Sequence, residues 1–252
     1  MKKTILITGA TSGIGKASAM LFAEKGYNVI ICGRRKERLE EIKNILSEKT
    51  SVFTLCFDVS KNEEVVSAIA LLPESFKKVD ILINNAGNAH GLAPIQEGNV
   101  DDWNKMIDTN LKGLLYVTKA VLPNMVATQT GHIINIGSIA GKEVYQNGNV
   151  YNASKFAVDA LGKAMLMDLN SFGIKVSNIN PGLVATEFSL VRFKGDVQRA
   201  ENVYKGYQPL TAEDIAETIY WVASLPAHVN ISDLTILPTT QASATIVKKN
   251  LA

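Results

Sequence analysis

The 252-residue sequence has few of the features that mark metal-binding, secreted or membrane-spanning proteins. It contains two cysteines without a CxxC pattern and three isolated histidines, so we expect no metal site. No stretch reaches the roughly 20 apolar residues that cross a bilayer, and the early apolar run Ile5–Ile7 is too short for a secretory signal. We therefore expect a cytoplasmic protein in which Cys32 and Cys56 are reduced, buried thiols.

The sequence also has little net charge, +2, and its basic residues gather only near Arg34–Arg38. Such a balance gives no electrostatic basis for nucleic acid as a partner. Hydrophobic residues make up 46% of the chain and charged residues 20%, which is typical of a globular protein that buries a large core. At this length we expect a single domain that spans residues 1–252.

Apolar runs of strand length alternate with longer helical patterns along the chain. Strands are expected at residues 3–8, 27–32, 52–57, 80–83, 132–137, 175–180 and 232–237. Helices are expected at residues 16–25, 35–48, 62–72, 101–127, 150–172 and 211–224, the fourth with a bend near Pro123. This alternation predicts an α/β fold, namely a doubly wound (Rossmann) parallel sheet of about seven strands with helices on both faces. The polar segment 186–208 interrupts the alternation, and we expect it to form a mobile cover over the carboxyl edge of the sheet.

A glycine-rich turn, Gly9-Ala10-Thr11-Ser12-Gly13-Ile14-Gly15, joins the first strand to the first helix. Its glycines permit a tight turn and close approach of the main chain to a ligand, and the start of the helix offers unpaired N–H groups to a pyrophosphate. Strand, turn and helix in this order form the nucleotide-binding unit of a doubly wound fold. An ordinary strand-to-helix turn of the same composition is the alternative.

The end of the second strand indicates which dinucleotide would bind. NAD-binding folds place an acid roughly 20 positions after the glycine turn to bind the ribose 2′-OH, whereas NADP-binding folds use a cation for the 2′-phosphate. Here Gly33 stands where the acid would be, and Arg34 and Arg35 follow it. We expect NADP, with a solvated helix start as the other interpretation of the two arginines.

Polar or turn-forming residues follow four of the other expected strands. They are Asp58 after the third, Asn84-Asn85-Ala86-Gly87 after the fourth, Ser138 after the fifth and Pro181-Gly182 after the sixth. Each alone could be a helix cap or a turn. Because ligands bind outside the carboxyl ends of such strands, the shared edge predicts one common site.

Tyr151 and Lys155 add a candidate for proton transfer. Residues four apart on a helix share a face, and a nearby ammonium favours phenolate and lowers the pKa of a tyrosine from about 10. Such a phenol can move a proton on and off an alcohol oxygen. The spacing alone is also typical of a solvated helix face.

Together these residues resemble the short-chain dehydrogenase/reductase family over essentially the whole chain. The matching set is Gly9-x-x-x-Gly13-x-Gly15, Asn84-Asn85-Ala86-Gly87, Asn110, Ser138, Tyr151-x-x-x-Lys155 and Pro181-Gly182. A closer resemblance, to the NADP-dependent 3-hydroxy acid dehydrogenases, is carried by segments 106–110, 131–138, 186–189, 191–196 and 225–231. That group oxidises the 3-hydroxyl of serine, L-allo-threonine and simple 3-hydroxy acids such as 3-hydroxypropionate, or reduces the matching semialdehydes.

The resemblance implies a role for each catalytic residue and a homotetrameric assembly. Tyr151 would be the acid/base and Ser138 the group that binds the substrate oxygen. Lys155 would lower the pKa of the tyrosine and bind the ribose, and Asn110 would hold a water that links Lys155 to solvent. The residues expected to contact NADP are Gly9, Thr11, Ser12, Gly13, Ile14, Gly15, Arg34, Arg35, Asp58, Val59, Asn84, Ala86, Gly87, Tyr151, Lys155, Pro181, Gly182, Val184 and Thr186.

The carboxylate of a hydroxy acid substrate needs a cationic partner, because an unpaired buried charge is costly. Arg192 and Lys194, in segment 186–208, are the candidates, and Arg192 is preferred for its bidentate geometry. We therefore expect Ser138, Tyr151 and Arg192 to bind the substrate.

Two other functions are compatible with parts of this pattern. A 3-oxoacyl carrier-protein reductase or a broad carbonyl reductase of the same family would share every catalytic residue. A regulator that binds NADP without turnover would not need Ser138, Tyr151 and Lys155 together.

Overall fold

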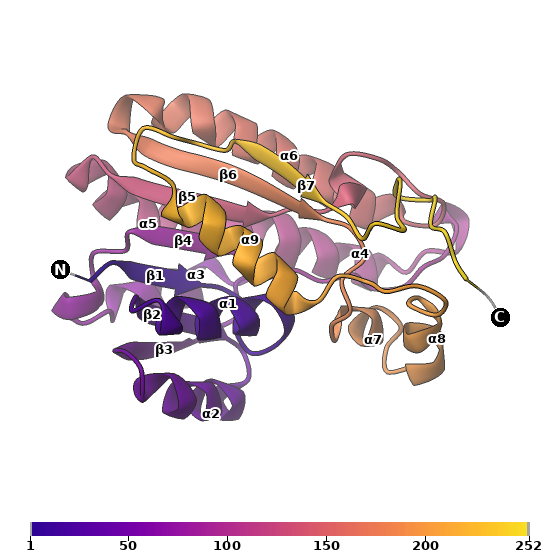
Figure 1. The fold of residues 1–252 in the computed structure, drawn as a ribbon, viewed down its shortest axis with the longest axis horizontal. Coiled ribbons are helices and arrows are strands. Elements are labelled where there is room, and N and C mark those ends of the chain that lie inside the picture. Colours follow the sequence, from indigo (N-terminus) through magenta and orange to yellow (C-terminus); the bar gives the residue numbers. More distant parts are fainter. Residues whose placement is uncertain (1, 251–252) are drawn as a thin grey trace.

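Seven strands form one parallel sheet in the computed structural model, which describes residues 2–250 (Figure 1). The strands are β1 Thr4–Ile7, β2 Asn28–Gly33, β3 Val52–Cys56, β4 Ile81–Asn84, β5 Gly131–Ile136, β6 Ile174–Pro181 and β7 Asp233–Ile236. Their order across the sheet is β3-β2-β1-β4-β5-β6-β7. From β1 the chain first adds β2 and β3 toward one edge of the sheet, and it then adds β4 to β7 on the other side of β1. The expected doubly wound sheet is confirmed, and its switch point lies beside the glycine-rich turn.

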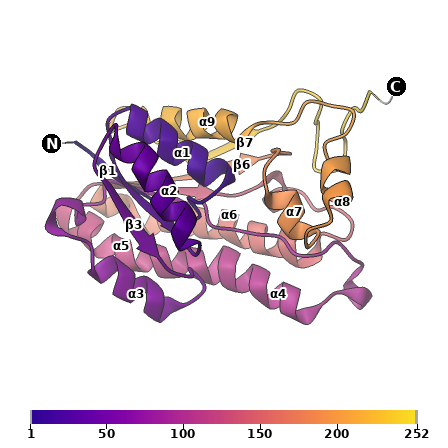
Figure 2. The same cartoon turned by 90° about the horizontal axis from the view of Figure 1, so that it is seen from below.

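Helices cover both faces of the sheet. They are α1 Gly13–Glu24, α2 Lys36–Ser47, α3 Asn62–Ala70, α4 Val100–Ile107, α5 Leu114–Thr128, α6 Asn149–Leu169, α7 Phe188–Arg192, α8 Val197–Asn202 and α9 Ala212–Ser224. Figure 2 shows α1, α2 and α9 on one side of the sheet and α3, α4 and α5 on the other. The short helices α7 and α8 lie beyond the carboxyl ends of the strands in Figure 1, where the cover was expected.

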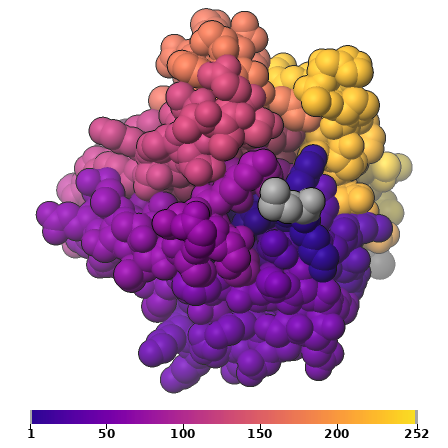
Figure 3. Space-filling model, turned by 90° about the vertical axis from the view of Figure 1, so that its left-hand side faces the viewer, coloured from indigo at the N-terminus to yellow at the C-terminus, as the bar shows by residue number. Residues whose placement is uncertain are grey.

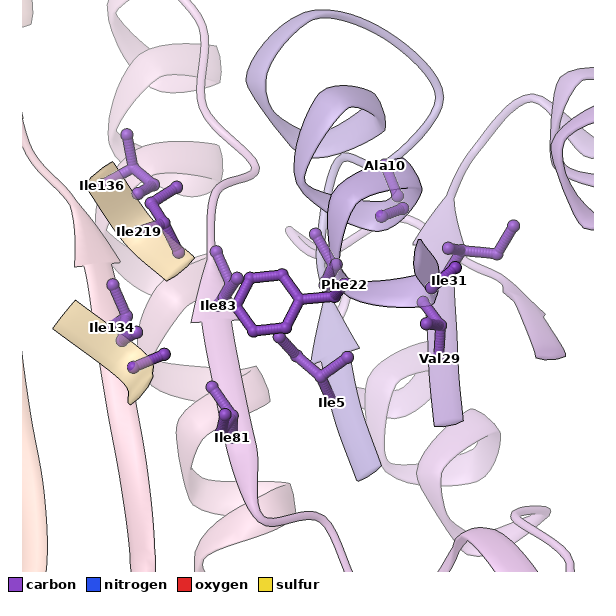
Figure 4. Packing of buried hydrophobic residues seen from close by; sticks show 14 of the residues in the cluster. Ile5, Ala10, Phe22, Val29, Ile31, Ile81, Ile83, Ile134, Ile136 and Ile219 are labelled. Carbon is purple, nitrogen blue, oxygen red and sulfur yellow. The ribbon is translucent and has the colours of Figure 1, made fainter. Parts of the chain in front are cut away.

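Alternate residues of the strands supply two separate cores. Ile5 and Ile83 face α1, where the ring of Phe22 packs between them (Figure 4). Leu6 and Leu82, the neighbours of those residues along the strands, belong to the core under α3, α5 and α6. Both sets are fully buried, and each large side chain contributes about 1.5–3 kcal/mol through removal from water. The two cores hold the carboxyl edge of the sheet rigid from both sides.

The expected helix 101–127 is wrong in one respect. It is divided into α4 and α5 by a π-helical turn, Asp108–Gly113, and the bend does not lie at Pro123, which is inside α5. π-helical turns are frequent at functional sites because they re-aim a side chain that a regular helix would place elsewhere. Here the re-aimed residue is Asn110, one of the expected site residues.

The expectation for the cysteines is also only half right. Cys32 is buried in β2, whereas Cys56 is an exposed free thiol on β3. The difference arises because β3 is the outermost strand and has a neighbour on one side alone.

On the face that Figure 3 shows, the earlier and later parts of the chain lie in separate regions, although α9 packs against α1 in the core. Figure 3 shows the side on which the N-terminus lies, with earlier residues in indigo and purple below and later residues in pink to yellow above. Among residues 2–250, no helix has both the length and the apolar character to cross a membrane.

Candidate active site

The glycine-rich turn after β1 is held against the segment that follows β4. Asn85 Nδ2 donates hydrogen bonds to the carbonyl oxygens of Thr8, at 2.8 Å, and Gly9, at 3.2 Å. The Thr8 hydroxyl accepts hydrogen bonds from the N–H groups of Asn85 and Ala86, both at 3.0 Å. These bonds cross the switch point, so the two loops that flank the expected dinucleotide crevice form one unit.

The turn packs at distances that only glycine permits. Gly9 has a φ of +65°, and a Cβ at Gly15 would lie 2.5 Å from the Gly9 carbonyl oxygen. The hydroxyl of Ser12, the N-cap residue of α1, accepts a hydrogen bond from Arg35 Nη2 at 2.9 Å and does not cap the helix. The first turn of α1, which includes Ile14, holds no acidic residue. Its N–H groups and its positive dipole end therefore fit a pyrophosphate.

Arg34 and Arg35 lie at the carboxyl end of β2, beside this turn. Arg35 Nη2 donates to Thr11 Oγ1 at 2.7 Å, while the exposed Arg34 pairs with Asp58 at 3.4 Å. Gly33 is packed so closely that a Cβ would lie 2.7 Å from Thr11 Cγ2. An acidic side chain therefore does not fit where NAD-binding folds place one, and the two guanidinium groups suit a 2′-phosphate.

Most of the other residues expected to contact the cofactor line the same edge of the sheet. Val59, Ala86, Gly87, Pro181, Gly182, Val184 and Thr186 end or follow β3, β4 and β6. Thr186 packs against the turn itself, because a Cβ at Gly13 would lie 3.3 Å from its side chain. The buried Asn84 Nδ2 donates to Thr118 Oγ1 and Asn135 Oδ1, while Asn84 Oδ1 has no hydrogen-bond partner among the described residues. Its contact with the cofactor stays a prediction.

Ser138, Tyr151 and Lys155 meet at the carboxyl end of β5. Ser138 follows that strand, and the other two residues lie at the start of α6. All three are buried, with exposed fractions of 8%, 8% and 7%. Lys155 Nζ donates to the Ile136 carbonyl oxygen at 2.9 Å, so the ammonium is anchored to the strand.

Burial controls the acidity of these groups. Burial raises the pKa of the Tyr151 phenol and the Tyr145 phenol adds to this, while hydrogen bonding by Ser138 and the charge of Arg192 lower it. Burial also lowers the pKa of Lys155 to about 8. In this structure burial therefore outweighs any lowering of the Tyr151 pKa by a neighbouring cation, and the expected effect of Lys155 stays a prediction. The ammonium is engaged by the main chain of β5, and the cost of taking a phenolate out of water dominates.

Asn110 joins the loop after β4 to α6. Its Oδ1 accepts from the Asn88 N–H at 2.8 Å, and its Nδ2 donates to the Asn88 carbonyl at 2.9 Å and to Ser154 Oγ at 3.0 Å. A Cβ at Gly87 would lie 3.4 Å from Asn110 Oδ1 and 3.5 Å from Lys155 Nζ, so the amide and the ammonium are neighbours. The expected water between Lys155 and solvent stays a prediction.

Arg192 reaches from α7 to Tyr151. Its Nη2 donates to the Tyr145 hydroxyl at 2.7 Å and its Nε donates to the Gly91 carbonyl at 3.2 Å. The guanidinium carbon lies 5.5 Å from the centre of the Tyr151 ring. Both residues line a pocket of about 220 Å³, whose wall also includes His90, Asp102, Trp103, Met106 and Lys194. This is the arrangement expected of a site that holds a small anion beside a proton-transfer group.

Three ion pairs hold the segment 186–208 over the site. Lys194 Nζ pairs with the buried Asp102 at 2.8 Å, on the side of the pocket. Glu187 pairs with Arg35 at 3.1 Å and with Arg38 at 2.8 Å, on the side of the expected phosphate. The sequence places Arg38 in a basic cluster but does not predict that it pairs with Glu187, or Lys194 with Asp102, because charges so far apart in the chain show their pairing only in the folded structure. The hydrogen bond between Arg192 and Tyr145 could not be predicted either, because the two residues are distant in the sequence.

Several known proteins resemble this chain over nearly its whole length. The family model described as short chain dehydrogenase matches residues 3–195. The NADP-dependent 3-hydroxy acid dehydrogenase of Salmonella typhi is 48% identical, over 95% of this chain and 96% of that protein. Sulfoacetaldehyde reductase 2 of Chromohalobacter salexigens is 46% identical, over 96% of each. A solved structure, the closed form of serine dehydrogenase complexed with NADP+, matches with a TM-score of 0.92 and 45% identity, and covers 98% of this chain and 100% of that one.

Proposed function

The chain belongs to the short-chain dehydrogenase family, and we propose that it transfers a hydride between NADP and the C3 hydroxyl of a small 3-hydroxy acid. It is an oxidoreductase that acts on CH–OH groups with NADP as its cofactor. Serine, L-allo-threonine and 3-hydroxypropionate represent the proposed class of substrate. The observation that carries this proposal is the pocket that joins Tyr151 to Arg192, because it offers one proton-transfer group and one cation within a small volume.

Tyr151 and Ser138 act on the substrate oxygen. In the reductive direction the Tyr151 phenol donates its proton to the substrate oxygen while Ser138 donates a hydrogen bond to the same oxygen, on which negative charge grows. In the oxidative direction the phenolate form of Tyr151 accepts the hydroxyl proton. The bound nicotinamide supplies the hydride acceptor. Because burial raises its pKa, the phenol of Tyr151 is protonated near neutral pH, which is the form that the reductive direction requires.

Arg192 binds the substrate carboxylate. Its hydrogen bonds to Tyr145 and Gly91 use two of the five N–H donors of a guanidinium and fix its orientation. The remaining donors can form a bidentate pair with a carboxylate. This assigns the anionic end of the substrate to α7 and the reacting end to α6.

A panel of substrates tests the proposal. With NADP(H), we expect turnover of serine, L-allo-threonine, 3-hydroxypropionate or their semialdehydes, and weak or no turnover of an acetoacetyl thioester. In the variant Arg192→Ala, KM for the acids should rise about 10- to 100-fold, the scale of a lost charged hydrogen bond, with a smaller change in kcat. An unchanged KM, or a preference for the thioester, would contradict the assignment.

Two alternatives are separated by the same panel. The chain is 46% identical to a sulfoacetaldehyde reductase, and a guanidinium can bind a sulfonate as it binds a carboxylate. Sulfoacetaldehyde is therefore included in the panel of substrates.

A reductase of acyl groups on a carrier protein needs an open path for a long substrate, whereas here the Lys194–Asp102 pair forms part of the wall of the pocket.

We also propose that the protein is a homotetramer. The exposed face of α6 carries a stripe of apolar residues, Ala153, Phe156, Ala160, Ala164 and Met167. Phe156 and Met167 are 40% and 78% exposed in the single chain. A helix face of this kind is normally buried, and a second copy of the chain is the partner that the family resemblance favours.

A further inference from the structure

Glu187 connects the cover to the cluster of arginines beside the glycine turn. It is the N-cap residue of α7, and its carboxylate accepts hydrogen bonds from Arg35 Nη1 at 3.1 Å and from Arg38 Nη1 at 2.8 and 3.2 Å. The same Arg35 donates to Thr11 Oγ1 and Ser12 Oγ on the turn. Arg35 therefore bonds at once to the Glu187 carboxylate of the cover and to the Thr11 and Ser12 hydroxyl groups that precede α1.

The placement of this carboxylate is fixed by its neighbours. Thr186 packs against the turn at Gly13, and the Thr186 hydroxyl accepts a hydrogen bond from the N–H of Phe188 at 3.3 Å. Phe188 in turn packs on the ring of Tyr151, with 5.6 Å between ring centroids. Glu187 is thus held between the cofactor side and the catalytic side of the site.

The ion pairs of Glu187 with Arg35 and Arg38 are formed in this structure but are partly exposed, so another anion can take the place of the carboxylate. Hydrogen bonds from Arg38 and Arg35 hold the pKa of the carboxyl below its usual value against the opposing effect of burial, so it is ionised at neutral pH. All three side chains are 42–43% exposed. Solvent screens pairs of this kind, and another anion can replace the carboxylate.

We propose that Glu187 competes with the 2′-phosphate of the cofactor for Arg35 and Arg38, and so sets the selectivity between phosphorylated and unphosphorylated dinucleotides. The inference rests on the proposed use of NADP. A 2′-phosphate that pairs with these guanidinium groups displaces or repels the carboxylate, while a free 2′-OH does neither. Arg38, in the first turn of α2, becomes a further ligand of the phosphate beside the expected Arg34 and Arg35.

The competition also links cofactor binding to the cover. Because the carboxylate and the phosphate share the same cations, phosphate binding weakens the contact of the cover at Glu187, and this contact weakens phosphate binding by an equal factor. The contact between Lys194 and Asp102, farther along the segment, does not involve these arginines, so we expect it to persist. The cover would therefore loosen on the phosphate side while it stays closed on the substrate side.

The variant Glu187→Gln tests the competition through binding alone. Titration calorimetry would measure Kd for adenosine 2′,5′-bisphosphate and NADP, and for adenosine 5′-monophosphate and NAD. We expect about fivefold tighter binding of the two 2′-phosphorylated ligands, on the scale of partly exposed ion pairs, and less than a twofold change for the other two. Unchanged or weaker binding of the bisphosphate by the variant would overturn the proposal, since it would show that Glu187 is neutral or positions the arginines for phosphate.

Two further variants separate local competition from general charge effects. Glu24→Gln removes the same charge and also breaks an exposed ion pair, with Lys49, but lies at the far end of α1. It should leave every Kd unchanged, and an equal gain would assign the effect to net charge and overturn the proposal. In the background Arg38→Ala the gain from Glu187→Gln should shrink, because one shared cation is gone. The bisphosphate lacks nicotinamide, so its response is distinct from a failure of the chain to bind NADP at all.

Discussion

At the scale of one residue, the helix determines where the Tyr151 phenol lies and burial determines most of the shift in its pKa. The helix places the phenol beside Lys155, as its position four residues earlier predicts, yet burial and not the ammonium has the larger effect on its pKa. A proton donor is therefore ready before a substrate arrives. Hydrogen bonding by Ser138 and the charge of Arg192 counter part of that effect, so the groups that we propose to bind the substrate also affect the pKa of Tyr151.

Replacement of Tyr151 by Phe tests this assignment. The ring keeps its contact with Phe188, but the proton donor is lost, so kcat should fall by at least about a thousandfold. Steady-state kinetics would measure kcat, and titration calorimetry would show Kd for NADP within about twofold of the parent. Tyr116→Phe, the same chemical change on α5, is the control and should keep kcat. A Tyr151→Phe protein with more than a tenth of the parental kcat would refute the role.

At the scale of elements, the sequence predicts far more of the fold than of the site. Period, composition and glycine position predict each strand to within one or two residues. The signal is clearest in central strands such as β1 and β4, because strands buried on both faces must be apolar. The π-helical turn Asp108–Gly113 was not predictable, since it is set by bonds from Asn110 to Asn88 and Ser154 that link distant segments. Contacts of the cover, such as Arg192 with Tyr145, escape prediction for the same reason.

A buried histidine between two central strands provides a test at this scale. His132 of β5 shares a 2.8 Å hydrogen bond with Ser177 of β6, and burial lowers its pKa to about 3. The unfolded chain binds a proton at about pH 6.5, so between pH 6.5 and pH 3 the unfolded state holds more protons than the folded state. This group therefore makes the free energy of unfolding fall with falling pH, by about 1.4 kcal/mol per pH unit at most.

The variant His132→Gln should remove that contribution. Urea unfolding at pH 7, 5.5 and 4.5, at one protein concentration, should show a shallower loss of stability than in the parent, by about 2–3 kcal/mol over this range. Ser177→Ala breaks the same hydrogen bond but keeps the imidazole, so its stability should fall with pH as steeply as that of the parent. Parallel curves for the parent and His132→Gln would show that the imidazole does not titrate in this window.

At the scale of the whole molecule, the switch point of the sheet explains why one edge carries all of the chemistry. The loops after β1 and β4 separate there, and the turn, the arginines, Ser138 and the start of α6 all open onto the same side. α6 has a second role. One face presents Tyr151 and Lys155 to the site, and the opposite face is the apolar stripe. Assembly of copies through α6 would therefore stiffen the helix that carries the catalytic pair.

The variant Ala160→Arg tests whether the apolar stripe is an interface. Ala160 is exposed in the single chain, so a longer side chain fits the fold, but a charge at the centre of the stripe opposes burial against a partner. Light scattering coupled to size exclusion should give a mass near four times 27.3 kDa for the parent and a smaller assembly for the variant. Ala70→Arg, the same change at an exposed position of α3, is the control and should keep the parental mass.

A parent that elutes as a single chain would refute the tetramer, and an Ala160→Arg protein that keeps the tetrameric mass would place the interface on another face. Because α6 carries Tyr151, a dissociated variant should also lose part of its kcat, whereas an unchanged kcat would show that one chain forms a complete site.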